Sequence, residues 1–419
     1  MGENLIHPKQ LKRGSDLCRV CNSSELFTGM HLGNLPIANE LALNPDSRAD
    51  LFDLTMKICS SCGLGQVGED ILPKRLFSDY RYMSSISSMF VEHAKSFVEN
   101  ILPSIDKNSG EWVLEIASND GYLLQFLSDA GVDVLGVEPA VNIATYANER
   151  GIPTLNEFFS SDLAQKILND RGFPRYVIAN NVLAHVPDIN DFVMGISILT
   201  GPETQVSIEN PSIMNILEGG QFDTIYHEHF SYLSVSSMQT ISKLNNLSLY
   251  DVEQIPIHGG SNRYWLCRKE RMEVQKRLQD LIKIEFDLGL FDRENWKAAQ
   301  ARMEGLIIAF EDLLVSIADA NGVVCGYGAA AKSSTILNMT KNSLGGLVSI
   351  ADESIEKQGR YLPAMNIPIE SPLEMFKRLP TDIVIFPWNI EKEIKSKIDS
   401  QSHTKINVWK LVPTLTKIN

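Results

Sequence analysis

Short apolar runs alternate with helix-like segments through the middle of the chain. A run at 112–116 leads into a turn at 117–121, and three further runs occur at 134–137, 176–179 and 206–208. Polar residues follow the ends of these runs. Strands that alternate with helices predict a parallel sheet, which binds its ligands at the carboxyl ends of the strands.

The same alternation returns near the end of the chain. Apolar runs at 323–325, 347–351, 382–386 and 407–409 predict a second parallel sheet. Before them, residues 266–320 carry apolar positions at helical spacing with charged residues interleaved, which predicts a helical bridge.

Two helix boundaries can be read from the sequence. Apolar positions predict one helix from about Met89 to Leu102. Asn321 and Gly322 predict the end of the bridge, because both residues tolerate the left-handed conformation that terminates helices.

The first part of the chain is rich in residues typical of loops. Turn-forming residues at 35–36 and 44–46 predict a small, loop-rich module at 1–75. The next segment, 76–88, is rich in Ser and Tyr and is either a linker or a lid packed over the following domain. The predicted organisation is a module at 1–75, a central domain at 76–265, the bridge at 266–320 and a C-terminal domain at 321–419.

Length and charge narrow the classes of function. A chain of 419 residues exceeds what one hydrophobic core usually supports, so two or three domains are expected. The net charge of -14 and the lack of Lys/Arg-rich blocks argue against a nucleic-acid partner. No apolar run approaches the roughly 20 residues that span a bilayer, and residues 1–14 are too polar for a signal peptide. We therefore expect a cytoplasmic protein without a membrane partner.

Four of the six cysteines form two pairs with two-residue spacing. The pairs are Cys18 with Cys21, and Cys59 with Cys62. Two such pairs can complete a tetrahedral four-sulfur zinc site. Redox-active pairs or disulfides are the alternative, but a cytosolic chain of this length does not need disulfides. A site closed by four thiolates has no open position for substrate, so the zinc is expected to be structural.

The run Tyr226-His227-Glu228-His229 concentrates four titratable groups in consecutive positions. Histidine changes its charge near neutral pH, and a neighbouring carboxylate or phenol can hold its tautomer. The run is therefore typical of a general base with its supporting groups. Two other interpretations remain open. The histidines could cap a turn, or the run could bind a metal. The spacing argues against the metal, because it lacks the helical geometry of a His-Glu-x-x-His zinc site.

The turn at 115–121 resembles the cofactor loop of S-adenosylmethionine-dependent methyltransferases. In that class a glycine lets the backbone approach the methionine part of the cofactor. An acidic residue at the end of the second strand accepts hydrogen bonds from the ribose hydroxyls. Gly121 and Glu138 match these two roles. Only Gly121 is present in the turn, which disfavours a dinucleotide. Ala117 replaces a glycine common in the class, and a plain strand-to-helix turn is the alternative. The candidate cofactor-binding residues are Glu115, Ala117, Asn119, Gly121, Glu138 and Asn180.

Three further polar runs are candidates for the substrate. The glycine-rich turn at 326–332 suits a phosphate, with Lys332 near a helix N-terminus, unless it is only a structural turn. His185 follows a predicted strand, and His258 precedes two glycines that permit close approach. Either histidine could instead be structural.

Together these motifs resemble bacterial S-adenosylmethionine-dependent C-methyltransferases that build branched deoxysugars on nucleotide-diphosphate carriers. The resemblance covers nearly the whole chain. It rests on the order of the four cysteines, YRYMSS at 80–85, EIASNDG at 115–121, NNVLAHVP at 180–187, YHEH at 226–229, HGGS at 258–261, GYGAAAK at 326–332 and WN at 388–389. It implies an α/β fold with a small zinc-binding N-terminal module, a central Rossmann-like methyltransferase domain and a C-terminal Rossmann-like domain.

The resemblance also implies a reaction and its residues. The substrate would be a dTDP-linked 4-keto-6-deoxysugar, methylated at C3 by S-adenosylmethionine. His229 would be the base, Glu228 its partner or an orienting group and Tyr226 a donor, whereas His227 would be structural. The implied substrate contacts are Tyr82, Ser84, His185, His258 and Lys332.

Other functions fit the sequence less well. An O- or N-methyltransferase would not need a base that deprotonates carbon. A nucleotide-sugar oxidoreductase or epimerase would need the missing dinucleotide glycines. A non-catalytic zinc-ribbon protein that binds a partner such as RNA conflicts with the acidic composition.

Overall fold

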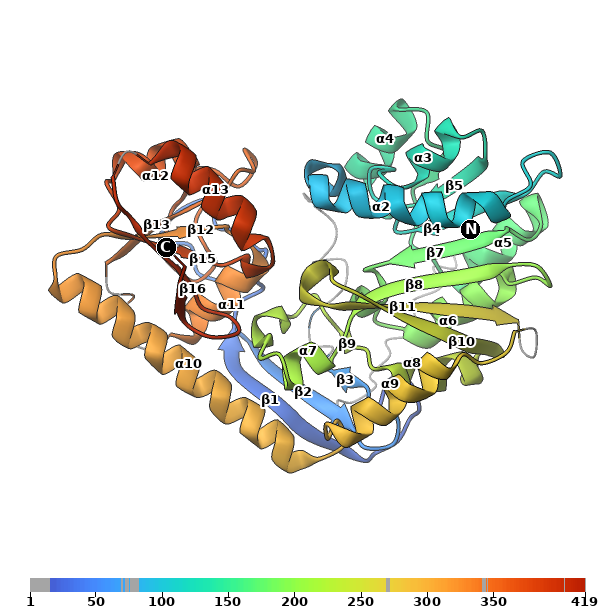
Figure 1. Ribbon diagram of the computed structural model, residues 1–419, viewed down its shortest axis with the longest axis horizontal. Helices are drawn as coiled ribbons and strands as arrows, with labels where there is room; N and C mark the ends of the chain where they lie inside the picture. Colours follow the sequence, from blue (N-terminus) through green and yellow to red (C-terminus); the bar gives the residue numbers. More distant parts are fainter. Residues whose placement is uncertain are drawn as a thin grey trace, which may run out of the picture.

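The computed structural model describes residues 16–68, 71, 75, 83–268, 272–340, 344, 346–402 and 404–418. Two α/β lobes lie beside each other, and an N-terminal sheet and two long helices run along them (Figure 1). This arrangement confirms the predicted α/β class with two Rossmann-like sheets.

The central sheet has seven strands in the order β10-β11-β8-β7-β4-β5-β6. The strands from β8 to β6 are parallel, and β10 and β11 extend the sheet in antiparallel pairing. Apolar side chains of the parallel strands face both layers of helices, as the nearly continuous apolar runs predict. The strands are β4 (Trp112–Ile116), β5 (Asp133–Val137), β6 (Thr154–Leu155), β7 (Tyr176–Asn180), β8 (Gln205–Pro211), β10 (Leu247–Ile255) and β11 (Ser261–Arg268).

Helices cover both faces of the central sheet. On one face α2 buries Phe97, Val98 and Ile101 against the core, which confirms the helix predicted near 89–102. On the other face α5, α6 and α8 pack over the strands. The helices are α2 (Ser88–Ile101), α3 (Leu124–Asp129), α4 (Val141–Glu149), α5 (Ser161–Arg171), α6 (Ile189–Leu199), α7 (Met214–Leu217) and α8 (Val235–Leu244).

The C-terminal sheet has the order β14-β13-β12-β15-β16-β17 and is parallel except for β17. Each apolar run predicted in this region forms a strand. The strands are β12 (Val324–Tyr327), β13 (Leu347–Ala351), β14 (Ile369–Glu370), β15 (Asp382–Ile385), β16 (Asn407–Lys410) and β17 (Thr416–Lys417). The helices of this lobe are α11 (Ala331–Met339), α12 (Pro372–Lys377) and α13 (Glu391–Gln401).

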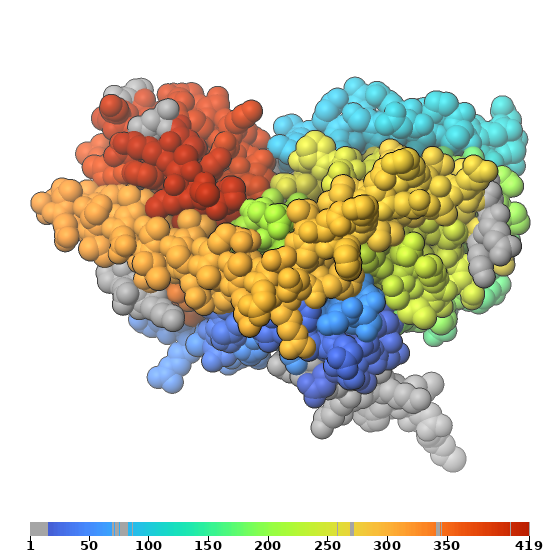
Figure 2. Space-filling view, turned by 60° about the horizontal axis from the view of Figure 1, so that its bottom comes forward, coloured from blue at the N-terminus to red at the C-terminus, as the bar shows by residue number. Residues whose placement is uncertain are grey.

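The helical bridge consists of α9 (Lys276–Asp287) and α10 (Arg293–Asp319). Figure 2 shows the two helices crossing one face of the molecule from the central lobe to the C-terminal lobe. Trp296, Phe310 and Leu314 of α10 are buried in a core shared with the N-terminal and C-terminal sheets. Asn321 has a left-handed φ of 55° just after α10, as predicted for the end of this bridge.

The N-terminal region differs from the loop-rich prediction. β1 (Leu26–Leu35) and β2 (Phe52–Cys59) form an antiparallel pair, and β3 (Gly65–Gln66) and β9 (Ser231–Tyr232) complete a four-stranded sheet. Two register shifts interrupt the β1–β2 ladder, so the sequence lacks a regular two-residue alternation there. Because β9 comes from the central segment, this sheet is continuous with the central lobe and the domain boundaries above remain predictions.

None of the helices in the described ranges is long and apolar enough to cross a membrane. The longest of them, α10, carries charged residues along its length.

A buried carboxylate joins the bridge to the central lobe. Glu285 of α9 accepts hydrogen bonds from the backbone N–H groups of Val235 and Ser236 and from the Ser236 hydroxyl. These N–H groups belong to the first turn of α8 and have no partner within the helix. Glu285 therefore caps α8 from another helix.

We predict that Glu285→Ala lowers the free energy of unfolding by about 2 kcal/mol, because buried donors lose a charged acceptor. Denaturant unfolding would measure the change. Gln279→Ala on the exposed side of the same helix is the control and should change stability by less than about 0.5 kcal/mol. Equal stability of the two variants would contradict the capping role.

Candidate active site and zinc centre

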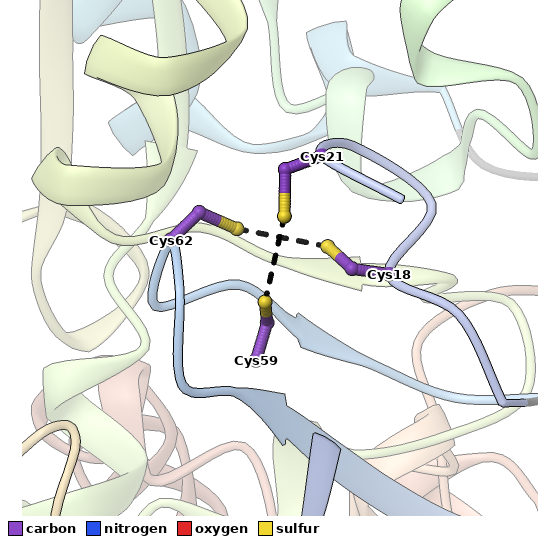
Figure 3. A group of neighbouring side chains, drawn as sticks. All are labelled: Cys18, Cys21, Cys59 and Cys62. Carbon is purple, nitrogen blue, oxygen red and sulfur yellow. Dashed lines mark hydrogen bonds between the residues drawn. The ribbon is translucent and has the colours of Figure 1, made fainter. Parts of the chain in front are cut away.

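The four predicted zinc ligands lie together near the start of the N-terminal sheet. Cys59 ends β2, and Figure 3 shows the sulfur atoms of all four cysteines pointing toward a common centre. The Sγ atoms of Cys18 and Cys62 are 3.6 Å apart, as are those of Cys21 and Cys59, and all four lie within 4.8 Å of one another. Zn–S bonds of about 2.3 Å in a tetrahedron separate sulfurs by about 3.8 Å. The four cysteines are free thiols and fit zinc.

The zinc centre is part of the central core. Cys18, Cys59 and Cys62 pack in one cluster with side chains of the central sheet and of α8. The Arg19 side chain donates to the Val67 carbonyl oxygen over 2.6 Å and so ties the two cysteine turns together. The metal would therefore organise the contact between the N-terminal sheet and the central lobe.

The turn after β4 adopts the conformation expected for a cofactor loop. Ala117, Asn119 and Gly121 have φ values of 56°, 50° and 78°. Left-handed backbone is uncommon for residues other than glycine and is found at functional sites. Glu138 holds the turn, because the Asn119 N–H donates to its Oε2 at 3.1 Å and the Ala140 N–H donates to its Oε1 at 2.9 Å.

Buried polar atoms gather around this turn. Glu115 is 1% exposed, and burial raises its pKa well above the usual value, with smaller contributions from the charges of Asp120 and Glu138. Burial also raises the pKa of Glu138. Four buried atoms near the turn have no hydrogen-bond partner among the described residues: Glu115 Oε2, Ser118 Oγ, Asp120 Oδ1 and Asn180 Oδ1.

Such atoms fit a polar ligand, because buried polar groups normally have partners. The amine, carboxylate and hydroxyl groups of S-adenosylmethionine could supply them. A second glycine, Gly136 of β5, lies beside the turn. A Cβ at this position would lie 2.4 Å from Ser118 Oγ, so only glycine leaves room for the Ser118 side chain. Ser118 and Asp120 are not among the predicted residues, although they lie within the predicted motif.

The described end of the predicted linker or lid contacts this turn. The backbone N–H of Ser84 donates to Asn119 Oδ1 at 2.9 Å, and that of Ser85 donates to Asp120 Oδ2 at 3.3 Å. The described residues 83–88 of the segment therefore pack on the next domain, as the lid interpretation expects. Tyr82 lies outside the described residues.

His229 has a defined tautomer. Its Nδ1 lies 2.9 Å from the Thr224 carbonyl oxygen, and its Nε2 lies 2.9 Å from the Tyr226 hydroxyl. A carbonyl oxygen can only accept, so Nδ1 carries the hydrogen and the lone pair of the neutral ring is on Nε2. The Tyr226 O–H therefore donates to Nε2, and Tyr226 and His229 form a hydrogen-bonded pair.

His185 lies against the same pair. Its ring centroid is 4.7 Å from that of His229, and its Nδ1 donates to the Glu228 carbonyl oxygen over 2.8 Å. Burial lowers the pKa of His185 and favours the neutral ring. The structure thus places His185, the last residue of η3 (Leu183–His185), beside the predicted catalytic run at 226–229.

The two remaining residues of the run differ in their surroundings. Glu228 is 4% exposed, and burial raises its pKa. Its Oε1 accepts hydrogen bonds from Asn39, a residue to which no sequence motif pointed. His227 packs edge-on against Phe52, and burial lowers its pKa. These contacts agree with a structural role for His227.

Lys332 lies in a polar cluster between the central and C-terminal lobes. Its ammonium lies 4.1 Å from the centre of the Trp388 ring and donates to Asn389 Oδ1 at 3.1 Å. The Trp388 indole N–H donates to Asp223 Oδ2 at 2.7 Å. Burial lowers the pKa of Lys332, and the charge of Asp223 partly offsets this effect. Asp223 belongs to η4 (Phe222–Thr224), so the cluster adjoins the carbonyl that holds His229.

The HGGS motif also reaches this cluster. A Cβ on Gly259 would lie 2.3 Å from the Trp388 ring, so glycine is required for the contact. The Gln221 side chain donates to the Gly259 carbonyl oxygen at 2.8 Å. The backbone of His258 belongs to η5 (Ile257–Gly259), and its substrate role stays a prediction.

Comparisons with known proteins agree with this geometry. Three family models match the chain: a zinc binding domain over 18–77, a methyltransferase domain over 88–252 and a C-methyltransferase C-terminal domain over 256–413. C-methyltransferase NovU of Streptomyces niveus is 30% identical over 389 residues, which are 92% of this chain and 93% of that protein. The chain belongs to the C-methyltransferase family.

Solved structures resemble this C-methyltransferase over less of its length. Magnesium protoporphyrin IX methyltransferase of Synechocystis PCC 6803 is 14% identical, with a TM-score of 0.33, over 47% of this chain and 89% of its own. The PH0226 protein of Pyrococcus horikoshii OT3 is 15% identical, with a TM-score of 0.35, over 48% of this chain and 97% of its own. At these TM-scores the matches add nothing to the family assignment.

The protein is thus an S-adenosylmethionine-dependent C-methyltransferase with an N-terminal zinc module and a C-terminal α/β domain. The assignment favours carbon over oxygen or nitrogen as the methyl acceptor. It also gives no support to an oxidoreductase, an epimerase or a non-catalytic binding protein.

The C-methyltransferase is expected to contain one zinc ion per chain, bound by the four cysteines. Cys59→Ser should lose the ion and lower the free energy of unfolding by about 4 kcal/mol or more. Metal analysis and thermal unfolding would test this, with Ser60→Ala in the same turn as the control. A zinc-free protein with an unchanged melting temperature would contradict a structural metal.

Glu138→Ala should weaken S-adenosylmethionine binding by about 10- to 100-fold, because the Asn119 N–H of the turn at 117–121 and the Ala140 N–H before α4 both lose their acceptor. Isothermal titration calorimetry would measure the dissociation constant. Glu149→Ala, on the exposed end of α4, should leave it unchanged. A change of less than twofold in Glu138→Ala would show that Glu138 does not support the cofactor.

Proposed function

We propose that this C-methyltransferase removes a proton from C3 of a dTDP-linked 4-keto-6-deoxysugar and methylates that carbon to give a branched-chain sugar. The tautomer of His229 carries the proposal, because it leaves a lone pair on Nε2 beside Tyr226 and His185. Methyl transfer to carbon needs a carbon nucleophile. A carbon next to a ketone becomes one when a base removes its proton.

His229 is the proposed base. Its Nε2 takes the proton from C3, and the electrons of the C–H bond move toward the C4 carbonyl oxygen to form an enolate. The Nδ1–H stays bonded to the Thr224 carbonyl oxygen, whose partial negative charge stabilises the imidazolium. The same contact keeps the ring in one orientation.

Tyr226 takes part in this proton transfer. In the neutral pair its O–H donates to His229 Nε2. That bond occupies the only lone pair of Nε2, so the Tyr226 O–H must leave it before Nε2 can take the C3 proton. The released hydrogen can then be donated to the C4 carbonyl oxygen as the enolate forms.

Glu228 is the proposed second donor to the enolate oxygen. Burial raises its pKa and favours the neutral carboxyl group. Its Oε2 is buried and has no hydrogen-bond partner among the described residues. A neutral carboxyl group in an apolar site can stabilise an enolate by donating its hydrogen. His185, whose ring lies against that of His229, is proposed to contact the keto-sugar.

S-adenosylmethionine supplies an electrophilic methyl group bound to sulfur. The residues proposed to hold it lie at the carboxyl ends of β4, β5 and β7, where a parallel sheet binds its ligands. They are Glu115, Ala117, Asn119, Gly121, Glu138 and Asn180. Their role is to bring the methyl group in line with the carbanion.

The nucleotide part of the substrate is proposed to contact Lys332. Tyr82 is proposed to contact the keto-sugar, and Ser84 and His258 are further proposed substrate contacts. A diphosphate needs a local cation, because the chain has a net charge of -14. Lys332 is the candidate: burial lowers its pKa, and the charge of Asp223 acts in the opposite direction and favours the ammonium form. Its cluster joins the two lobes, which supports a nucleotide position between the central and C-terminal sheets.

Incubation in deuterated water tests the proposal. A panel of dTDP-4-keto-6-deoxysugars with hydroxyl, amine or hydrogen at C3 would be supplied first without and then with S-adenosylmethionine. We expect exchange of the C3 hydrogen in at least one sugar without the methyl donor, and a mass gain of one methylene with it. A panel that shows neither change would reject the proposed substrate class.

His229→Ala should lower both exchange and methyl transfer by at least about 100-fold, because the proposed base and its hydrogen bond with Tyr226 are both lost. Its affinity for S-adenosylmethionine should stay within twofold. His31→Ala, an exposed histidine of β1, is the control. Turnover near the unsubstituted rate in His229→Ala would exclude His229 as the base.

A further inference from the structure

Glu228 has an asymmetric environment. Oε1 accepts two hydrogen bonds from Asn39, one from the backbone N–H at 3.2 Å and one from the side-chain amide at 3.0 Å. Oε2 is buried and accepts none from the described residues. The two oxygens of this carboxyl group are therefore not equivalent.

The asymmetry fixes the position of the proton. An oxygen that accepts two N–H groups has little capacity left to carry a hydrogen, so the proton of the neutral carboxyl group resides on the other oxygen. Asn39 thus holds the hydrogen of Glu228 on Oε2. It also orients the carboxyl plane, because both of its donors meet one oxygen.

The turn that carries Asn39 is held at two points. The Arg75 side chain bonds both carboxylate oxygens of Glu40, at 3.0 and 2.8 Å. Ala42 exchanges two backbone hydrogen bonds of 2.9 Å with Tyr361 of the C-terminal lobe. The donors are therefore in place before any ligand binds, which is the requirement for preorganised stabilisation.

Other charged and titratable groups near Glu228 do not replace this contact. Glu40 adds a negative charge that is paired with Arg75. Tyr232 is buried, and its pKa is raised well above the usual value by burial. The His185 ring bonds the backbone carbonyl of Glu228 and not its carboxyl group.

We propose that Asn39, a residue of the N-terminal zinc module, is a positioning residue that aims the Oε2–H of Glu228 at the carbonyl oxygen of the substrate. The module then contributes directly to the active site, in addition to its structural zinc. This inference rests on the proposed function, because it deepens the role of Glu228 as a donor to the enolate.

Carbon-13 NMR of protein labelled at the glutamate carboxyl carbon tests the contact without substrate. The Glu228 signal is assigned by its loss in Glu228→Gln. In Asn39→Leu a donor that favours the ionised carboxyl group is gone, so the pKa of Glu228 rises and its acid dissociation constant falls about tenfold. Asn39 is exposed, so this change removes no core packing. Asn44→Leu, an exposed asparagine after the same turn, should leave the constant unchanged.

Proton exchange at C3 of the keto-sugar panel gives the functional readout. We expect Asn39→Leu to lower kcat for exchange about tenfold. The affinity for S-adenosylmethionine and the melting temperature should not change. In the pH profile of the exchange rate, the pKa that belongs to Glu228 should rise. An unchanged dissociation constant overturns the inference. A shifted constant with normal exchange also overturns the positioning role but leaves the proposed function intact. No exchange in the unsubstituted protein rejects the proposed function, and the role of Asn39 with it.

Discussion

In the proposed mechanism, the hydrogen on Nδ1 of His229 decides whether this ring can act as the base. The Thr224 carbonyl oxygen, 2.9 Å away, has no hydrogen to give and so keeps the lone pair on Nε2. The proposed roles of His229 and Tyr226 follow from that lone pair. Tyr226 donates to it in the resting pair, and when the Tyr226 O–H leaves, Nε2 can take the C3 proton and the Tyr226 hydrogen can be donated to the developing enolate. The opposite tautomer would present a donor to the substrate and could not remove a proton.

All three parts of the fold support this short segment. The central lobe supplies His185, which bonds the Glu228 carbonyl oxygen. The N-terminal sheet supplies Asn39, and the C-terminal lobe supplies Trp388, which bonds Asp223 beside Thr224. Buried polar groups are stable only when their partners are in place. The long helix α10 and the shared core hold the two lobes in fixed relation and so keep these partners together.

The sequence predicted the features that depend on local pattern. The strand runs of both sheets, the helix at 89–102 and the four-cysteine cluster agree with the structure, because apolar periodicity and ligand spacing are local properties. The β1–β2 pair was not predicted, since register shifts disturb its alternation. The roles of Asn39 and Asp223 could not be predicted from the sequence. Their partners, Glu228 and Trp388, lie 189 and 165 residues away along the chain. Such contacts are set by tertiary packing and leave no pattern in a single sequence.

The most direct test of the central claim is the tautomer of His229. Long-range nitrogen-15 NMR of histidine-labelled protein distinguishes a protonated from an unprotonated ring nitrogen, and His229→Ala assigns the signal. At a pH where the ring is neutral, we predict hydrogen on Nδ1 and a lone pair on Nε2. Hydrogen on Nε2 would contradict the role of His229 as the base.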